Sequence, residues 1–195
     1  MYIRKVVLDK IRNIDHLEIS FSKPAGWHVL IGDNGAGKST ILRAIALAII
    51  GPYESGALRL GLHSFLRMGC DEGSVELTVK RDADHDRYAT NSAPLKRPFK
   101  AGIKISKTSG NGRRTAKVST LEDYDHADNY LWSGKDGWFA TSFGPFRRFT
   151  GGNKEWDKVY YANPRAGAHL SIFGEDVALT ESLEWLRELN YKRLE

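Results

Sequence analysis

The sequence has very little cysteine: Cys70 is the single thiol among 195 residues. One thiol excludes an intrachain disulfide and is typical of a protein in a reducing compartment. A secretory signal is also missing, because residues 1–6 have no apolar core. The longest apolar run, within residues 41–50, is far shorter than the about 20 residues of a membrane-spanning helix. We therefore expect a cytoplasmic protein with no membrane contact.

Acidic side chains are missing from residues 91–120, which carry eight lysines and arginines although the net charge of the whole chain is +5. The segment predicts a hairpin of strands 102–106 and 115–119, joined by a turn at residues 109–112 (SGNG). A basic hairpin is either a footprint for nucleic-acid phosphates or a sheet edge that lysines protect from aggregation, and the sequence leaves both open. The nucleic-acid candidates are Lys104, Lys107, Arg113, Arg114 and Lys117.

The most informative pattern that is present is a glycine-rich loop at residues 32–39 (GDNGAGKS), which fits G-x-x-x-x-G-K-[ST]. Its glycines let backbone N–H groups turn toward the α- and β-phosphates of a nucleotide, where a Cβ would obstruct them. Lys38 offers positive charge to the β- and γ-phosphate oxygens, and the Ser39 hydroxyl is placed to ligate Mg²⁺. The pattern predicts a nucleoside triphosphate site.

The segments on both sides of this loop are those that its chemistry requires. Residues 27–31 are a short apolar run typical of a buried strand. Residues 41–50 predict a helix that Gly51 and Pro52 end. The start of such a helix directs the positive end of its dipole at bound phosphates. Strand, loop and helix in this order favour nucleotide binding over an ordinary glycine-rich turn.

The rest of the chain is assigned from its periodicity. We predict a hairpin at 2–21, a helix at 56–68, a strand at 74–80, a strand at 138–143 and an amphipathic helix at 181–195. The last helix ends in charge without a capping glycine or proline, so we expect a piece of a longer protein. The predicted organisation is one ATP-binding lobe over 1–195, with the hairpin, loop and helices in 1–70, a mostly β subdomain in 71–165 and a helical segment in 166–195.

One acidic stretch imitates a metal site. Residues 82–86 (DADHD) match the start of a calcium-binding loop. Arg87 stands where such a loop needs glycine, and Ala93 stands where it needs a bidentate glutamate. We therefore expect a loop here and no calcium site.

Three segments carry a family resemblance. Residues 10–14 (KIRNI) followed by 32–42 (GDNGAGKSTIL) resemble the N-terminal half of SMC/RecF-type ABC ATPases, including RecF, SMC-like DNA-repair ATPases and OLD nucleases. Residues 143–148 (FGPFRR) are similar to bacterial AAA-labelled ATPases of phage defence, of the Septu or retron kind, in which an ATPase works beside a nuclease. The resemblance implies an α/β P-loop NTPase: the N-terminal lobe of an ABC-type head, with a mixed central sheet and an antiparallel β subdomain.

The resemblance also implies roles for individual residues. Arg12 matches a family arginine near the nucleotide phosphates, although an exposed edge-strand arginine remains the alternative. Ser39 matches the Mg²⁺ ligand and Lys38 the phosphate lysine. The implied ATP-binding set is Arg12, Gly32, Asn34, Gly35, Ala36, Gly37, Lys38, Ser39 and Thr40.

Three family motifs are missing. The chain contains no glutamine, no apolar run that ends in Asp-Glu and no L-S-G-G sequence. In the family these supply the glutamine that meets Mg²⁺, the acidic Walker B pair and the element that clamps ATP from a second subunit. The catalytic residues are therefore unknown, and the segment alone is expected to hold Mg-ATP without hydrolysing it efficiently. In a complete head we expect ATP-dependent homodimerisation and hydrolysis in DNA repair or anti-phage defence, with DNA and a nuclease as candidate partners.

Two other functions are compatible with the same loop. A nucleotide or small-molecule kinase would use Arg113 with Arg114, or Arg147 with Arg148, as lid arginines, although the N-terminal hairpin speaks against it. A nucleic-acid-binding module stabilised by nucleotide would use the basic hairpin instead.

Overall fold

The computed structural model describes residues 1–58, 61–88, 95, 97–110, 113–121, 125–132, 136–145, 156, 158, 162–174 and 190. The chain forms two compact units, Met1–Ala140 and Thr141–Glu195. The predicted helix at 181–195 lies outside the described residues apart from Asn190.

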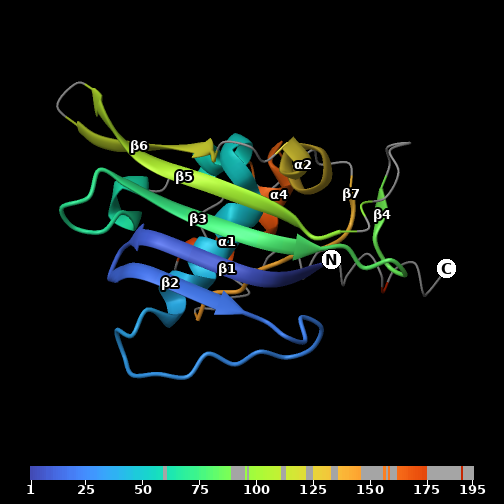
Figure 1. Ribbon diagram of the computed structural model, residues 1–195. Helices are drawn as coiled ribbons and strands as arrows, with labels where there is room; N and C mark the ends of the chain where they lie inside the picture. The colour runs from blue at the N-terminus through green and yellow to red at the C-terminus, as the bar shows by residue number, and fades with distance from the viewer. Residues whose placement is uncertain are drawn as a thin grey trace. The chain divides into compact units, whose positions relative to one another are not determined.

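The first unit is built on a five-stranded sheet with the order β2-β1-β3-β5-β6 (Figure 1). Its strands are β1 (Tyr2–Ile11), β2 (Ile14–Ser20), β3 (Glu72–Lys80), β5 (Phe99–Gly110) and β6 (Arg113–Thr120). Every pair of neighbours in this sheet is antiparallel. A parallel pair, which a mixed sheet requires, is not found among the described strands. Two short strands, β4 (Arg87–Tyr88) and β7 (Asp136–Gly137), pair separately.

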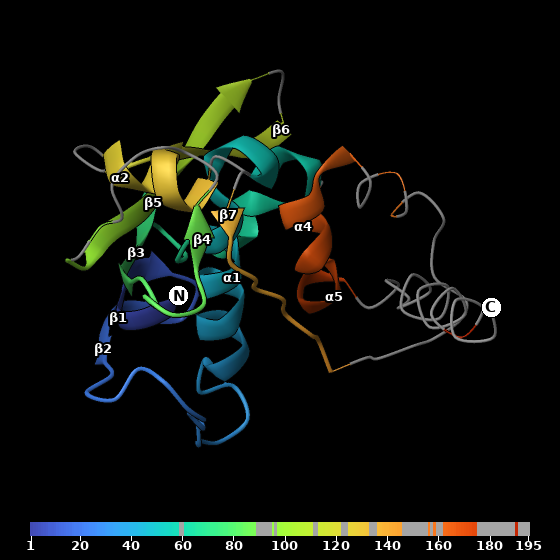
Figure 2. The ribbon, with the colours of Figure 1, turned by 90° about the vertical axis from the view of Figure 1, so that its right-hand side faces the viewer.

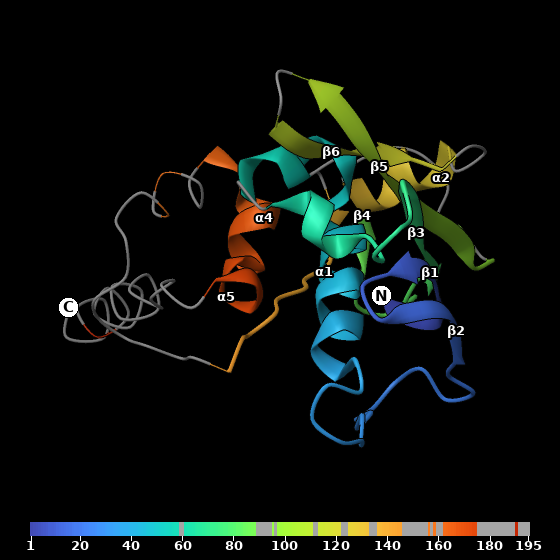
Figure 3. The same ribbon diagram turned by 90° about the vertical axis from the view of Figure 1, so that its left-hand side faces the viewer.

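One face of the sheet forms the core of this unit. Side chains alternate along the strands, so that Val6 and Leu8 of β1 and Val75 and Leu77 of β3 are all fully buried. Helix α1 (Lys38–Glu54) lies along this face in Figures 2 and 3 and buries its own apolar side chains there. The opposite face carries the charged members of the alternation. The sheet and helix therefore bury a single apolar layer.

Helix α1 bends at Gly51, whose φ of 79° and ψ of −178° are not helical. Pro52 has no N–H to donate to the carbonyl of Ala48, four residues earlier. The indole N–H of Trp132 donates to that carbonyl instead, at 2.9 Å. Trp132 ends a π-helical turn, η3 (Asp128–Trp132), which follows the short helix α2 (Asp125–Ala127). The substitute donor explains why the helix continues past the point where its sequence predicted an end.

Because of this continuation, the helical stretch is longer than its apolar run indicates. Lys38–Leu58 is long and apolar enough to cross a membrane by length and composition, with a mean hydropathy of 1.3. Of its most apolar window, 44% is buried inside the protein, and core helices pass the same test. The stretch is therefore weak evidence for a membrane span.

Several predicted elements are confirmed. The N-terminal hairpin is β1–β2, the strand at 74–80 is β3, and the basic hairpin is β5–β6. The turn of that hairpin at Asn111 and Gly112 lies outside the described residues.

Three predicted elements are wrong. The helix at 56–68 is replaced by two 3-10 turns, η1 (Ser55–Leu58) and η2 (Leu62–Phe65), which still bury Leu58 and Phe65. Residues 27–31 and 138–143 form no strand. Trp27 is 100% exposed and Ile31 92% exposed. A strand needs a neighbour for its backbone hydrogen bonds, and no described strand pairs with either segment.

The described part of the second unit contains helices α4 (Pro164–Ala168) and α5 (Leu170–Phe173). The extended segment 141–144 is bonded to them: the Ser142 hydroxyl lies 2.6 Å from Nδ1 of His169, and the Gly144 N–H donates to the Ser171 hydroxyl. Burial and the nearby Arg165 lower the pKa of His169 to about 4. Uncharged His169 is therefore part of the packing of this unit.

Candidate nucleotide site

The glycine-rich loop has the backbone conformation that its sequence predicts. Gly35 has a φ of 85° and Gly37 a φ of 95°, a region that side chains with a Cβ rarely adopt. Helix α1 begins directly afterwards at Lys38, and the Ile41 N–H donates to the Gly37 carbonyl at 2.9 Å. The loop therefore leads into the N-terminus of a long helix, where unpaired N–H groups attract anions.

The loop lysine lies across the loop. Nζ of Lys38 donates to the carbonyls of Gly32 at 2.6 Å and Asp33 at 2.7 Å. Phosphate oxygens are stronger acceptors than these carbonyls, so the ammonium is placed to transfer to a phosphate in the loop. Ser39 is exposed, whereas Thr40 is only 7% exposed. Of the two hydroxyls, that of Ser39 is available to a metal ion, and the residues present fit a triphosphate with Mg²⁺.

The turn between β1 and β2 touches this loop. The side-chain amide of Asn13 donates to the Gly35 carbonyl at 2.9 Å. Both amide atoms of Asn13 stand 3.4 Å from the position that a Cβ on Gly37 would occupy. Asn13 belongs to residues 10–14, which carry part of the family resemblance, but the sequence predicted no role for it. Its signal was the asparagine in the turn, a residue whose short amide commonly bonds to nearby backbone.

Arg12 is part of the same turn and lies outside both strands, so the edge-strand alternative is wrong. Its Nε donates to the Ser64 carbonyl at 3.3 Å, and its guanidinium lies 5.1 Å from the centre of the Phe65 ring. Burial and the neighbouring Arg43 lower the pKa of Arg12. Beside it is a pocket of about 480 Å³ lined by Arg12, Asn13, Ser64, Leu66, Arg67 and Met68. Arg12 is therefore held at the wall of a pocket. One residue of this wall, Asn13, also contacts the glycine-rich loop of residues 32–39, which we call the P-loop.

The basic hairpin is partly neutralised by β3. Lys104 pairs with Glu72 and Lys107 with Asp71, both at 2.8 Å. Lys117 is exposed and has no ion pair among the described residues, and the side chains of Arg113 and Arg114 lie outside them. The sequence missed these pairings because the carboxylates lie outside the basic segment, and Asp71 is 36 positions from its partner Lys107. The alternating polar positions of β3, which include Glu72, were the available signal.

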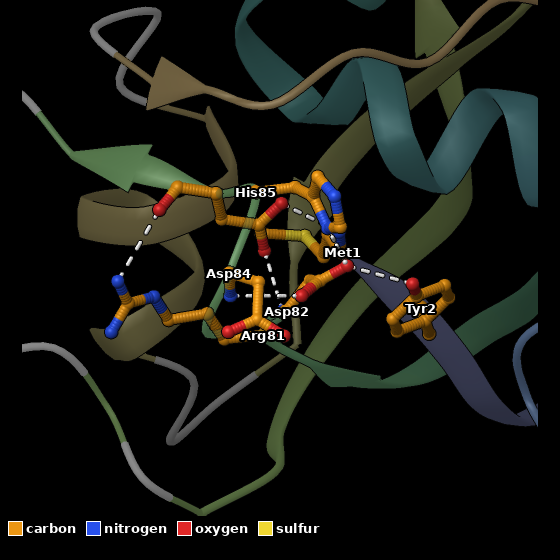
Figure 4. A network of polar contacts seen from close by, with 7 residues as sticks. Met1, Tyr2, Arg81, Asp82, Asp84 and His85 are labelled. Carbon is orange, nitrogen blue, oxygen red and sulfur yellow. Dashed lines mark hydrogen bonds and ion pairs between the residues drawn. The ribbon is translucent and has the colours of Figure 1, made fainter.

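The acidic stretch at 82–86 is a structural turn (Figure 4). Oδ2 of Asp82 accepts from the Tyr2 hydroxyl at 2.7 Å and lies 2.9 Å from Nδ1 of His85. The hydrogen bond from Tyr2 is the largest of several that hold the pKa of Asp82 well below its usual value. Asp86 pairs with the amino group of Met1 at 2.6 Å. These carboxylates face protein donors, and the described residues contain no group of three or more placed to hold a metal ion.

Comparisons with known proteins agree with the resemblance expected from the sequence. A family model described as AAA domain matches residues 5–154. Septu protein PtuA of Bacillus mycoides (strain KBAB4) is 35% identical over 83 residues, which are 40% of this chain and 12% of that protein. The DNA replication and repair protein RecF of Stenotrophomonas maltophilia (strain R551-3) is 34% identical over 113 residues, 58% of this chain and 28% of that protein.

A third relative is the DNA double-strand break repair Rad50 ATPase of Pyrococcus abyssi (strain GE5 / Orsay). It is 33% identical over 126 residues, which are 63% of this chain and 13% of that protein. The chain thus spans less than a third of the length of each of these curated relatives. The predicted P-loop NTPase fold class is confirmed by the family match.

Proposed function

The chain belongs to the AAA domain family over residues 5–154, and we propose that it is the ATP-binding lobe of an SMC/RecF/OLD-like ATPase. Its relatives support an ATPase-type function. The observation that carries the proposal is the loop itself. Two glycines with positive φ bend it at the start of the 17-residue helix α1, and the ammonium of Lys38 lies across it.

In this proposal the triphosphate replaces the present acceptors of Lys38. The ammonium leaves the carbonyls of Gly32 and Asp33 for the β- and γ-phosphate oxygens. The Ser39 hydroxyl ligates Mg²⁺, and the backbone of residues 34–37 surrounds the β-phosphate. Arg12 contacts the nucleotide from the neighbouring pocket, whose apolar members Leu66 and Met68 suit a base or ribose.

The chemistry of the complete head needs residues that this sequence does not contain. Without a glutamine, an apolar run that ends in Asp-Glu or an L-S-G-G signature motif, we propose that the water-activating group and the clamp on ATP come from another part of the protein or from a second head. ATP-dependent homodimerisation and hydrolysis would then switch a DNA-repair or anti-phage complex in the cytoplasm, with DNA and a nuclease as partners. The relatives RecF, Rad50 and Septu PtuA motivate this role.

DNA binding by the basic hairpin is the finer part of this proposal. It would rest mainly on Lys117, Arg113 and Arg114, because Lys104 and Lys107 already pair with carboxylates. A phosphate footprint predicts that the affinity for duplex DNA falls steeply as salt rises. An absence of DNA binding at low salt would remove this part and leave the ATP site unaffected.

The ATP site is tested by Lys38→Ala. We expect the affinity for a fluorescent ATP analogue with Mg²⁺ to fall by about tenfold or more, because a charge-assisted hydrogen bond contributes about 1.5–3 kcal/mol. Lys104→Ala is the matched control, since it removes an equal charge far along the sequence from the loop. Equal affinity of Lys38→Ala and the unmodified protein would contradict the proposal.

A further inference from the structure

A side chain from the turn between β1 and β2 bonds to the P-loop. The carbonyl of Gly35 accepts from the amide of Asn13 at 2.9 Å, and a Cβ on Gly35 would meet no atom within 4 Å. The space beside Gly35 is open, so the bond from Asn13 is a side-chain contact that can fix the direction of its carbonyl. We propose that Asn13 is a positioning residue that sets the direction of the Gly35–Ala36 peptide and so prepares the loop for phosphate. This inference rests on the proposed ATP-binding function.

Planarity of the peptide bond links the two sides of this group. In a trans peptide the C=O and the following N–H point in opposite directions. Holding the Gly35 carbonyl toward Asn13 therefore turns the Ala36 N–H into the loop. That N–H now donates to the Asp33 carbonyl at 3.2 Å, a long hydrogen bond. A phosphate oxygen in the loop would be a better acceptor for the same N–H.

Asn13 is itself held in place. Its backbone carbonyl accepts from Nη1 of Arg67 at 2.8 Å, and Nε of Arg67 lies 3.4 Å from the carboxylate of Asp15. The N–H of Arg12 donates to the Phe65 carbonyl at 2.9 Å. These contacts with residues 65 and 67 limit the freedom of the turn, so that the side-chain amide of Asn13 is presented to the loop before any ligand arrives.

The backbone of the turn supports a functional origin. Lys10 has a φ of 55° and Arg12 a φ of 49°, and these are the non-glycine residues with positive φ among those that the structure describes. Such conformations cost free energy and cluster where surrounding contacts impose a local geometry. Both stand within three residues of Asn13, Lys10 near the end of β1 and Arg12 in the turn that meets the P-loop. The turn is therefore strained at the place where it positions the loop.

Asn13→Leu tests the role of the donated hydrogen bond, because leucine has nearly the same size and no donor. In the full chain, we expect about a five- to tenfold loss of affinity for a fluorescent ATP analogue with Mg²⁺, the usual effect of one lost hydrogen bond. Asp9→Asn is a control on the same hairpin; Asp9 contacts His16 and has no contact with the loop among its recorded bonds. We expect it to bind ATP normally.

A measurement on the loop without nucleotide distinguishes a positioning role of Asn13 from a merely structural one. Amide hydrogen exchange of residues 35–38 should become faster in Asn13→Leu, while the amides of β3 keep their protection. Asn13→Asp serves if the leucine variant fails to fold: aspartate favours turns as asparagine does but cannot donate. It should show the same faster exchange. Since no phosphate is present, its added charge does not affect this measurement through the ligand.

The outcomes separate the two proposals. In one outcome, Lys38→Ala loses ATP binding, both Asn13 variants show the loop exchange of the unmodified protein, and Asn13→Leu binds ATP as tightly as the unmodified protein. Asn13 then has no positioning role, and the proposed function stands. If Lys38→Ala also binds ATP normally, the proposed function fails first. Faster loop exchange together with weaker ATP binding in Asn13→Leu would support the positioning role.

Discussion

The two ends of helix α1 use glycine for different purposes. Near its N-terminal end, Gly35 bends the chain into open space, where a Cβ would meet no atom within 4 Å. Near its C-terminal end, Gly51 bends the chain against a ring, and a Cβ would stand 2.5 Å from Cδ1 of Trp132. Both residues have a positive φ, but only the second is also enclosed. One end leaves room for a ligand, and the other is filled by the protein.

The polar groups at the two ends differ in the same way. At the kink, the Ala48 carbonyl that Pro52 leaves without a donor is satisfied by the buried indole of Trp132. In the loop, the carbonyls of Gly32 and Asp33 are satisfied by the long side chain of Lys38, which can leave them. A carbonyl that accepts from a fixed ring belongs to a structural joint. Carbonyls that accept from a mobile ammonium form a site that a ligand can enter.

Gly51→Ala should have the largest effect on stability. The added methyl group would overlap Trp132 and would also need a φ of 79°. We expect the free energy of unfolding to fall by about 3 kcal/mol or more, from overpacking together with a backbone conformation (φ 79°, ψ −178°) that only glycine adopts readily. Urea unfolding followed by tryptophan fluorescence measures it.

Gly37→Ala is the matched control at the other end. Its φ of 95° and ψ of 5° lie in the left-handed region, which is less unfavourable for alanine than the conformation of Gly51, and the new Cβ would be in ordinary contact with Asn13 at 3.4 Å. Only the backbone term remains, so we expect a loss of about 1–2 kcal/mol. Equal losses for the two variants would break the distinction between an open and an enclosed glycine.

The sequence predicted the elements whose signals are local. The alternation in 2–21 and 74–80 gave strands, and the glycines before Lys38 gave the loop and the helix start. The kink could not be predicted in this way. Gly51 and Pro52 locally indicate a helix end, and the donor that lets the helix continue lies 84 residues away in Trp132. Only the folded chain brings the two together.

The errors elsewhere have the same physical origin. Residues 27–31 have the composition of a buried strand, yet Val29 is 77% exposed because no described strand supplies a partner. In the basic hairpin, counting charges along the chain missed the carboxylates that β3 places opposite β5.

In the candidate site, the P-loop residues could be named from their pattern. The contact from Asn13 could not, because it depends on how the hairpin packs against the loop.

Trp132→Phe should have an intermediate effect on stability and none on ATP. Phenylalanine keeps an aromatic ring beside Gly51 but cannot donate, so the buried Ala48 carbonyl loses its partner. Leaving such a group unsatisfied costs about 1–3 kcal/mol. Chemical denaturation and an ATP titration of the same variant check both statements. Weakened ATP binding at a temperature where the variant is fully folded would show that the two ends are coupled.

Tyr53→Phe should have the smallest effect, because it acts at the surface of the kinked end. The Tyr53 hydroxyl donates to Asp128 at 2.9 Å, but the side chain is 68% exposed. We expect a loss of less than about 1 kcal/mol.

The same hydrogen bond raises the pKa of Tyr53. The folded protein therefore keeps the phenol proton at a pH where the unfolded chain releases it, and this contribution to stability is present below the ordinary tyrosine pKa and is lost as the pH rises through the raised value. Urea unfolding at neutral and at strongly alkaline pH should show the difference between Tyr53→Phe and the unmodified protein shrinking at the higher pH. A difference that stays constant would mean that the stabilisation by the Tyr53 hydroxyl does not come from the hydrogen bond to Asp128 that raises its pKa.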